Sequence, residues 1–363
     1  MEEKSKQILS EGDKNYLLIQ KKNKYPLFVR KVGFKWYNPL YAMWKLKRTV
    51  LPHNKIPYHD YDLPLSIDFI NYCFNNNIAF DTDFFSNDDA EQLIINHIDN
   101  RIKTLLSFAP EVIEEEIIDC YAYNKKLQKS VKRKGGKFLL KWEGVDYCLS
   151  DEKYTMLMCK YHNGLIHLPE TVKEKLVGKD FLDCGAFIGD SALVFLLYKP
   201  NEILAYEPVT KIYHDLCKTI SFNKHLGSEK IIPLQKGVGD VSSIMQIGCK
   251  RDSTSTLLNK HYSENTKTQD IEIVTIDDEC KNRNVGLIKM DIEGFEYNAV
   301  KGALETIKRD KPVLLISLYH TGKDFFEIPR LLKETVPEYT LTFIDIEPLK
   351  RIPEKILMAY IEC

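Results

Sequence analysis

The sequence lacks several features that would each assign it to a class of protein. Its nine cysteines are scattered and no two have CxxC spacing, which argues against a zinc ribbon and against a disulfide framework. We therefore expect reduced thiols and a cytoplasmic location. No apolar run approaches the ~18 residues of a membrane span. The polar N-terminal stretch MEEKSKQILSEGDKNY has no apolar core of the kind found in secretion signals.

Two phosphate-binding motifs are also missing. The G-x-G-x-x-G fingerprint of dinucleotide sites does not occur, and neither does the G-K-S or G-K-T of a triphosphate loop. A net charge of −1 indicates no particular class of partner. We do not expect nucleic-acid binding. These absences leave an ordinary globular protein, whose length of 363 residues predicts two or three domains.

One stretch dominates what is present, 179–191, which reads KDFLDCGAFIGDS. A short apolar run containing Asp183 is followed by Gly185 and Gly189, and a new apolar run begins at Ala192. This pattern is typical of a strand, a tight turn and a helix. Glycines allow a ligand to approach the backbone, and the N-terminus of the next helix offers free N–H groups. We expect the turn to hold a small polar molecule.

Strands and helices then alternate to the end of the chain, which predicts a parallel sheet covered on both faces. Expected strands are 179–184, 202–208, 231–234, 271–276, 285–290, 312–318, 339–346 and 356–363. Five of them run into a polar residue, and ligands bind at the carboxyl ends of the strands in such sheets. The five polar residues are Asp183, Glu207, Asp240, Asp291 and His320.

The first 135 residues have a different composition and predict a separate, mostly helical domain, with a hairpin after it at 137–149. Residues 20–50 contain nine Lys or Arg, no acid and seven aromatic residues. This basic aromatic strip is a candidate surface for an anionic glycan or a lipid headgroup. The alternative is that it packs against the acidic segment 60–120 of the same domain.

The spacing of the acids favours S-adenosylmethionine over a dinucleotide. Glu207 lies 24 residues after Asp183, at the end of the second strand, where an acid can bind the two ribose hydroxyls. The donor has an amino group, a ribose and an adenine, and it has no phosphate for a glycine-rich loop to hold.

Five segments resemble the FkbM family of class I methyltransferases, over about residues 150–360: LDCGAFIGDSA, ILAYEP, VTIDD, LIKMDIEGFEYNAVKGA and PVLLISLYH. The resemblance implies a Rossmann-like, doubly wound seven-stranded sheet with an antiparallel last strand, in a domain at 136–363. It also implies O-methylation of a hydroxyl on a sugar, glycan or secondary metabolite. Phe187, where the family often has Asn, and Leu318, where it often has an acid, depart from the pattern.

Site roles follow from the resemblance and from the strand ends together. The expected S-adenosylmethionine contacts are Asp183, Gly185, Ala186, Phe187, Gly189, Glu207, Gly239, Asp240 and Asp291. His320 is the first candidate base, because an unperturbed histidine titrates near pH ~6.5. Glu293 is the second candidate, and Asp291 positions the methionine part or the acceptor. We expect no metal, because the acids lack a fixed ligand spacing.

Two other classes of function stay open from the sequence alone. One is a non-catalytic glycan- or lipid-binding protein on the methyltransferase fold, which Phe187 and Leu318 would explain. The other is a nicotinamide-dependent oxidoreductase, which the missing glycine fingerprint disfavours. Binding of S-adenosylmethionine but not NAD would distinguish a methyltransferase from the oxidoreductase. Loss of methyl transfer with retained glycan or lipid binding would favour the binding protein.

Overall fold

The computed structural model describes 62–76, 85–86, 90–105, 114–151, 154–249, 267–346 and 354–362. All structural statements below concern these residues. The basic aromatic strip at 20–50 lies outside them. None of the described helices combines the length and the apolar composition that crossing a bilayer requires.

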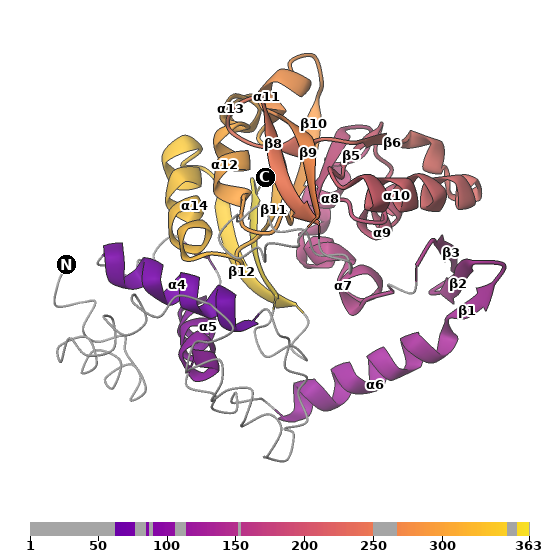
Figure 1. Ribbon diagram of the computed structural model, residues 1–363, viewed down its shortest axis with the longest axis horizontal. Coiled ribbons are helices and arrows are strands. Elements are labelled where there is room, and N and C mark those ends of the chain that lie inside the picture. The colour runs from indigo at the N-terminus through magenta and orange to yellow at the C-terminus, as the bar shows by residue number, and fades with distance from the viewer. Residues whose placement is uncertain are drawn as a thin grey trace.

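A seven-stranded sheet forms the centre of the molecule, in the order β12-β13-β11-β10-β4-β5-β6 (Figure 1). Its strands are β4 (Asp180–Cys184), β5 (Ile203–Tyr206), β6 (Ile231–Leu234), β10 (Val285–Met290), β11 (Val313–Ser317), β12 (Thr340–Ile346) and β13 (Glu354–Tyr360). Only β13 runs antiparallel to its neighbours within this sheet. The fold is therefore the expected Rossmann-like, doubly wound sheet with an antiparallel last strand.

Strand residues point alternately to two apolar cores, one on each face of the sheet, as a two-residue period requires. In β4, Phe181 packs into one core and Leu182 into the other. Helices on the first face include α7 (Met156–Cys159), α8 (Glu170–Glu174), α9 (Asp190–Phe195) and α10 (Thr210–Phe222). The second face is covered by α11 (Ile276–Glu279), α12 (Glu296–Lys301), α13 (Leu304–Asp310) and α14 (Gly322–Thr335). Short 3-10 turns complete the first layer at η1 (His162–His167), η2 (Leu196–Tyr198), η3 (Lys224–Leu226) and η4 (Ser228–Lys230).

One predicted strand belongs to a different sheet. The expected strand 271–276 is part of β9 (Lys267–Val274), which pairs with β7 (Gly237–Val238) and β8 (Ser243–Cys249) in a separate three-stranded sheet. The sequence analysis did not predict β8. Thr275 ends β9 and caps α11, because its hydroxyl accepts a hydrogen bond from the amide of Asp278. Asp240 therefore follows β7, and it does not end a strand of the central sheet.

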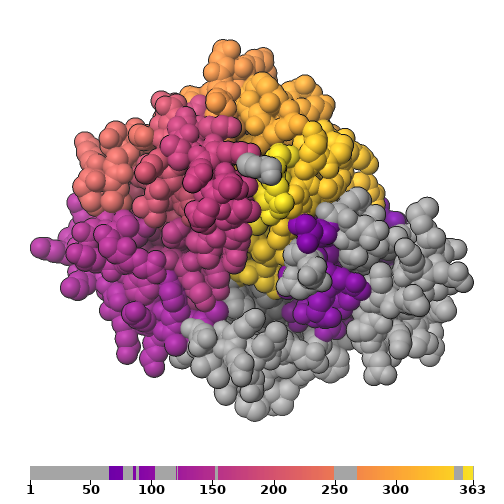
Figure 2. Space-filling model, turned by 180° about the vertical axis from the view of Figure 1, so that it is seen from behind, coloured from indigo at the N-terminus to yellow at the C-terminus, as the bar shows by residue number. Residues whose placement is uncertain are grey.

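The segment before the central sheet contains α4 (Asp62–Asn76), α5 (Ala90–Leu105) and α6 (Glu114–Ser130), followed by the hairpin sheet β1 (Lys132–Lys134), β2 (Lys137–Trp142) and β3 (Val145–Leu149). Phe69 of α4 and Ile94 of α5 are buried in the same core as α14. Figure 2 shows the indigo part of the chain lying against the yellow C-terminal strands. The division of the chain at residue 135 stays a prediction, and these helices share a core with the sheet.

Buried Arg101 connects α5 to the end of β11. Its guanidinium donates a hydrogen bond to the backbone carbonyl of Tyr319, the residue before His320. The ring of His97, one helical turn earlier, stacks on Phe325 of α14 and accepts a hydrogen bond from Arg101. The N-terminal helices therefore support the loop from which the candidate base projects.

Candidate active site

The loops after β4 and β10 touch at the switch point of the sheet, where the order of the strands reverses. The amide of Asp291 donates to the carbonyl of Cys184 at 3.0 Å, so the first residues beyond the two strands stay paired. Gly185 has φ +81°, and a Cβ built on it would lie 2.0 Å from the carbonyl oxygen of Asp291. Only glycine fits this crossing of two backbones.

Asp183 is fully buried at the end of β4 and is held by two neighbours. Its carboxylate lies 3.1 Å from Lys289 Nζ of β10 and accepts a hydrogen bond of 2.5 Å from Ser191 Oγ of α9. Lys289 also donates to the carbonyl of Gly185. Burial alone would lower the pKa of Lys289, but the surrounding carboxylates, Asp183 first, outweigh burial and raise it. Lys289 therefore stays charged, and its contacts with Asp183 and Gly185 fix the glycine loop on β10.

Glu207 occupies the position expected for a ribose contact. It follows β5, is 6% exposed, and accepts a hydrogen bond from the amide of Val209 at 2.8 Å. Burial raises the pKa of its carboxyl to about 7, although the backbone amides of Val209 and Phe187 oppose that rise. In its ionised form, Glu207 can accept hydrogen bonds from the two hydroxyls of a ribose.

A cavity of about 250 Å³ opens over these strand ends. Gly185, Phe187, Glu207 and Asp291 from the expected cofactor set line it, and so does Glu293. Apolar walls come from Ile212, Val238 and Ile247. The buried side-chain amide nitrogen of Asn163, also in the wall, has no hydrogen-bond partner within the described structure. This cavity fits S-adenosylmethionine. It offers an acid for the ribose hydroxyls, an apolar wall for the adenine and an unsatisfied hydrogen-bond donor.

Five of the nine expected cofactor contacts lie outside the lining of this cavity: Asp183, Ala186, Gly189, Gly239 and Asp240. The carboxylate of Asp240 accepts hydrogen bonds from Asn298 at 3.0 Å and from Lys301 at 3.4 Å, both on α12. Gly239 packs against Ile273 and Phe295. Gly302, which ends α12, contacts the carbonyl of Gly239 so closely that a Cβ would lie 1.9 Å from it. Gly239 and Asp240 dock α12 on the small sheet, and their contact with adenine stays a prediction.

Ala186 and Gly189 shape the glycine loop from behind the cavity. Ala186 is fully buried, and its amide donates to the carbonyl of Tyr206 at the end of β5. Gly189 has φ +88°, and a Cβ there would approach Leu216 of α10 to 2.8 Å. Both residues therefore hold the loop in place without lining the cavity.

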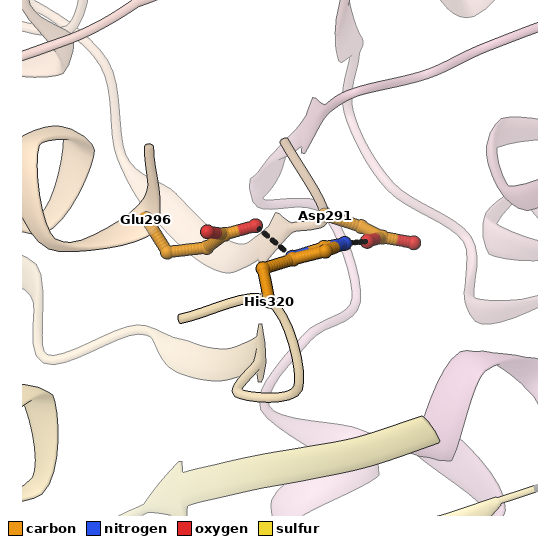
Figure 3. A group of neighbouring side chains, drawn as sticks. All are labelled: Asp291, Glu296 and His320. Carbon is orange, nitrogen blue, oxygen red and sulfur yellow. Dashed lines mark hydrogen bonds and ion pairs between the residues drawn. The ribbon is translucent and has the colours of Figure 1, made fainter. Parts of the chain in front are cut away.

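His320 and two carboxylates form a group at the other end of the site (Figure 3). The imidazole lies between Glu296 of α12 and Asp291 after β10. Its Nδ1 is 2.9 Å from Glu296 Oε1, and its Nε2 is 3.7 Å from Asp291 Oδ1 and 3.6 Å from Glu293 Oε2. Glu296 also accepts backbone hydrogen bonds from Ile292 and Gly294, so it orders the loop that carries both other acids.

The environment of His320 favours the imidazolium. The side chain is 1% exposed, and burial alone would lower its pKa. The carboxylates of Glu296, Glu293 and Asp291 outweigh burial and raise the pKa to about 10. A protonated imidazole accepts no proton and offers no lone pair to a metal ion, although Asp291, Glu296 and His320 are close enough together to be metal ligands. The geometry therefore supports a positioning role for His320 in place of the expected role as base.

This raised pKa predicts a pH dependence of stability. An imidazole with pKa about 10 when folded and about 6.5 when unfolded stabilises the fold fully below the unfolded value. That contribution is lost as the pH rises toward the folded value. We expect the difference in unfolding free energy between wild type and His320→Gln to shrink between about pH 7.5 and pH 9.5.

Urea unfolding at several pH values measures this difference. This pH window lies above the pKa of Asp324, a carboxyl close to His320. Burial raises the pKa of Asp324 to about 7. A difference that stays constant across the window would show that His320 is neutral in the folded protein.

Sequence reasoning missed three residues that the geometry brings to the site. Lys289 and Glu296 are the first and last residues of the quoted box KMDIEGFE, yet only their partners Asp183 and His320 received roles. Asn163 lies before the first strand of the sheet and carries no motif. Lys289 and Glu296 could have been recognised from the sequence, because each is an ionisable residue at the end of an apolar strand or just beyond it. A buried ionisable residue requires a partner.

Residues 183–339 match a family model described as the methyltransferase FkbM domain. A crystal structure of a methyltransferase FkbM from Methylobacillus flagellatus KT is similar at 18% identity and a TM-score of 0.42, covering 76% of this chain and 72% of that one. Fibrillarin from Aeropyrum pernix, solved with S-adenosyl-L-methionine, is similar at 14% identity and a TM-score of 0.36, covering 63% of this chain and 84% of that one. A search of curated proteins returned no match.

Proposed function

We propose that this chain, whose residues 183–339 match the methyltransferase FkbM domain, uses S-adenosylmethionine to methylate a hydroxyl oxygen on a sugar, glycan or secondary metabolite. The observation that carries the proposal is the pair of partly exposed carboxylates, Asp291 and Glu293, on the cavity wall beside the buried His320. A hydroxyl acceptor loses a proton during transfer, and a carboxylate at the reaction end of the cavity can take it.

The residues that would hold the donor follow from the cavity. Glu207 would bind the ribose, the apolar wall with Val238 and Ile247 would receive the adenine, and the loop at Gly185 would hold the methionine part. The bound sulfonium supplies an electrophilic methyl group. When the acceptor oxygen bonds to that methyl carbon, the carbon–sulfur bond breaks and its electron pair stays on sulfur. S-adenosylhomocysteine and the methyl ether are the products.

Side chains of this protein would position the acceptor and take its proton. Asp291 is fixed from two sides, since Tyr319 donates to its carboxylate at 3.2 Å and His320 lies at 3.7 Å. The side chain of Glu293 is 34% exposed, its backbone is left-handed with φ +59°, and the residue lines the cavity. In our proposal Glu293 takes the hydroxyl proton and Asp291 orients the acceptor. Positioning of this kind supplies most of the acceleration, and a base adds about 10²–10⁴-fold.

The test begins with the purified protein and calorimetric titration of S-adenosylmethionine, S-adenosylhomocysteine and NAD. We expect binding of the first two and none of NAD. A screen with donor labelled in the methyl group then measures transfer to free sugars, glycans and hydroxylated metabolites. Label found only on nitrogen or carbon acceptors would contradict the proposed oxygen chemistry.

Replacing Glu293 by glutamine is expected to lower turnover by about 10²-fold or more, because the amide cannot accept the proton. Donor binding should stay unchanged, because Glu207 and the glycine loop are intact. Single-turnover transfer and calorimetry measure the two effects separately. Wild-type turnover in Glu293→Gln would assign the base elsewhere, with Asp291 as the next residue to replace.

A further inference from the structure

Asn163 lies on the cavity wall in an unusual conformation. It is 3% exposed and belongs to η1, which packs against α9. Three consecutive residues there, His162, Asn163 and Gly164, have φ of +46°, +55° and +102°. Left-handed backbone in residues other than glycine is strained, and such strain gathers at functional sites. The turn therefore holds Asn163 at the cavity wall at a cost to stability.

The amide of Asn163 has unused donor capacity, as does the hydroxyl of Tyr206 in the same cavity lining. Asn163 Nδ2 is buried and has no hydrogen-bond partner among the described residues. By contrast, Ser191 donates to Asp183, and Lys289 donates to the carbonyl of Gly185. A buried amide without a hydrogen-bond partner destabilises the fold by about 1–3 kcal/mol. A bound ligand with an acceptor oxygen would remove this cost.

The position of Asn163 determines which part of S-adenosylmethionine it can contact. Gly164 packs against Leu315 of β11 and Ile344 of β12, on one side of β4. Glu207 follows β5, on the other side of β4. Asn163 is therefore at the end of the cavity away from the ribose acid, next to α9. That end also carries the carboxyl of Asp190, whose pKa burial raises to about 6.

We propose that Asn163 donates a hydrogen bond to the α-carboxylate of the methionine part of S-adenosylmethionine. The ammonium of that part is attracted to the acids Asp190 and Asp291, and its carboxylate needs an N–H donor. Phe187 presents an aromatic ring to the cavity from the glycine loop, so the loop side chain supplies no donor of its own. The inference rests on this cavity being the donor site.

The Asn163→Gly variant separates binding from structure. Glycine adopts the left-handed backbone without strain, so the turn stays in place while the amide is removed. We expect S-adenosylhomocysteine to bind at least about tenfold more weakly. 5′-Methylthioadenosine, which has the ribose and adenine but no amino-acid part, should bind as it does to the wild type. The matched control is Lys199→Gly, another left-handed residue at φ +54° that is exposed and lies outside the cavity lining.

Calorimetry measures the affinity for both ligands, and thermal unfolding measures the stability of the ligand-free variants. Equal binding of S-adenosylhomocysteine by Asn163→Gly and wild type overturns the inference, and so does an equal loss for both ligands. A wild-type protein that binds neither ligand would instead overturn the assignment of the donor site. An unfolding temperature of Asn163→Gly within a few degrees of wild type, together with the selective loss, establishes the contact.

Discussion

Glu296→Ala is expected to cost about 3–5 kcal/mol of unfolding free energy and to abolish methyl transfer. The carboxylate is fully buried, holds the imidazole of His320 and accepts two backbone amides of the loop at 291–294. Removing it leaves a buried positive charge beside two unsatisfied N–H groups. The loop that carries Asp291 and Glu293 would lose its fixed shape at the same time.

Chemical unfolding and labelled-methyl transfer measure both losses. Glu305→Ala is the matched control, because Glu305 is an exposed glutamate in the first turn of α13. We expect that variant to stay within ~0.5 kcal/mol of wild type, as most surface substitutions do. Wild-type stability of Glu296→Ala would mean that the loop is ordered by other contacts, and the positioning role of Glu296 would be wrong.

Lys289→Met is expected to have an effect of similar size on stability and also to weaken donor binding. The methionine fills most of the space but leaves the carboxylate of Asp183 buried without its cation, and a broken buried pair costs about 3–5 kcal/mol. The hydrogen bond to the carbonyl of Gly185 is lost as well. We expect the glycine loop to lift from β10 and the affinity for S-adenosylhomocysteine to fall.

A double variant tests the cause of this effect. Asp183→Asn in the Lys289→Met background removes the uncompensated charge, so the pair of changes should destabilise less than the sum of the two single changes. The measurement is a double-mutant cycle of unfolding free energies. Additive losses would contradict a direct interaction between the two side chains.

The sequence was sufficient to predict the sheet because β4, β5, β10 and β11 are short apolar runs that a helix follows. Strand β10 at Val285–Met290 matches the prediction residue for residue. The strand at 271–276 was assigned to the wrong sheet, because an apolar run does not identify its pairing partner. The small sheet forms through β8, whose partner lies across a gap of 17 residues between Cys249 and Lys267.

Site residues that belong to a local sequence pattern could be predicted. Residues that depend on a side chain distant in the sequence could not. Gly185 and Glu207 stand in local patterns, a turn and a strand end. The pairing of Glu296 with His320 joins residues 24 apart on different elements. The charge state of His320 depends on three carboxylates that converge only in the folded chain, so the sequence alone did not indicate that its pKa is raised.

The position of β13 has a consequence for how the protein folds. This strand comes last in the sequence, yet it lies between β11 and β12 and pairs with both. Until β13 is synthesised, β12 has no partner in the central sheet and β11 presents an open edge directly before Tyr319 and His320. Productive folding of the reaction end must therefore wait for the final strand, and a chain cut short before Glu354 would expose two strand edges that favour aggregation.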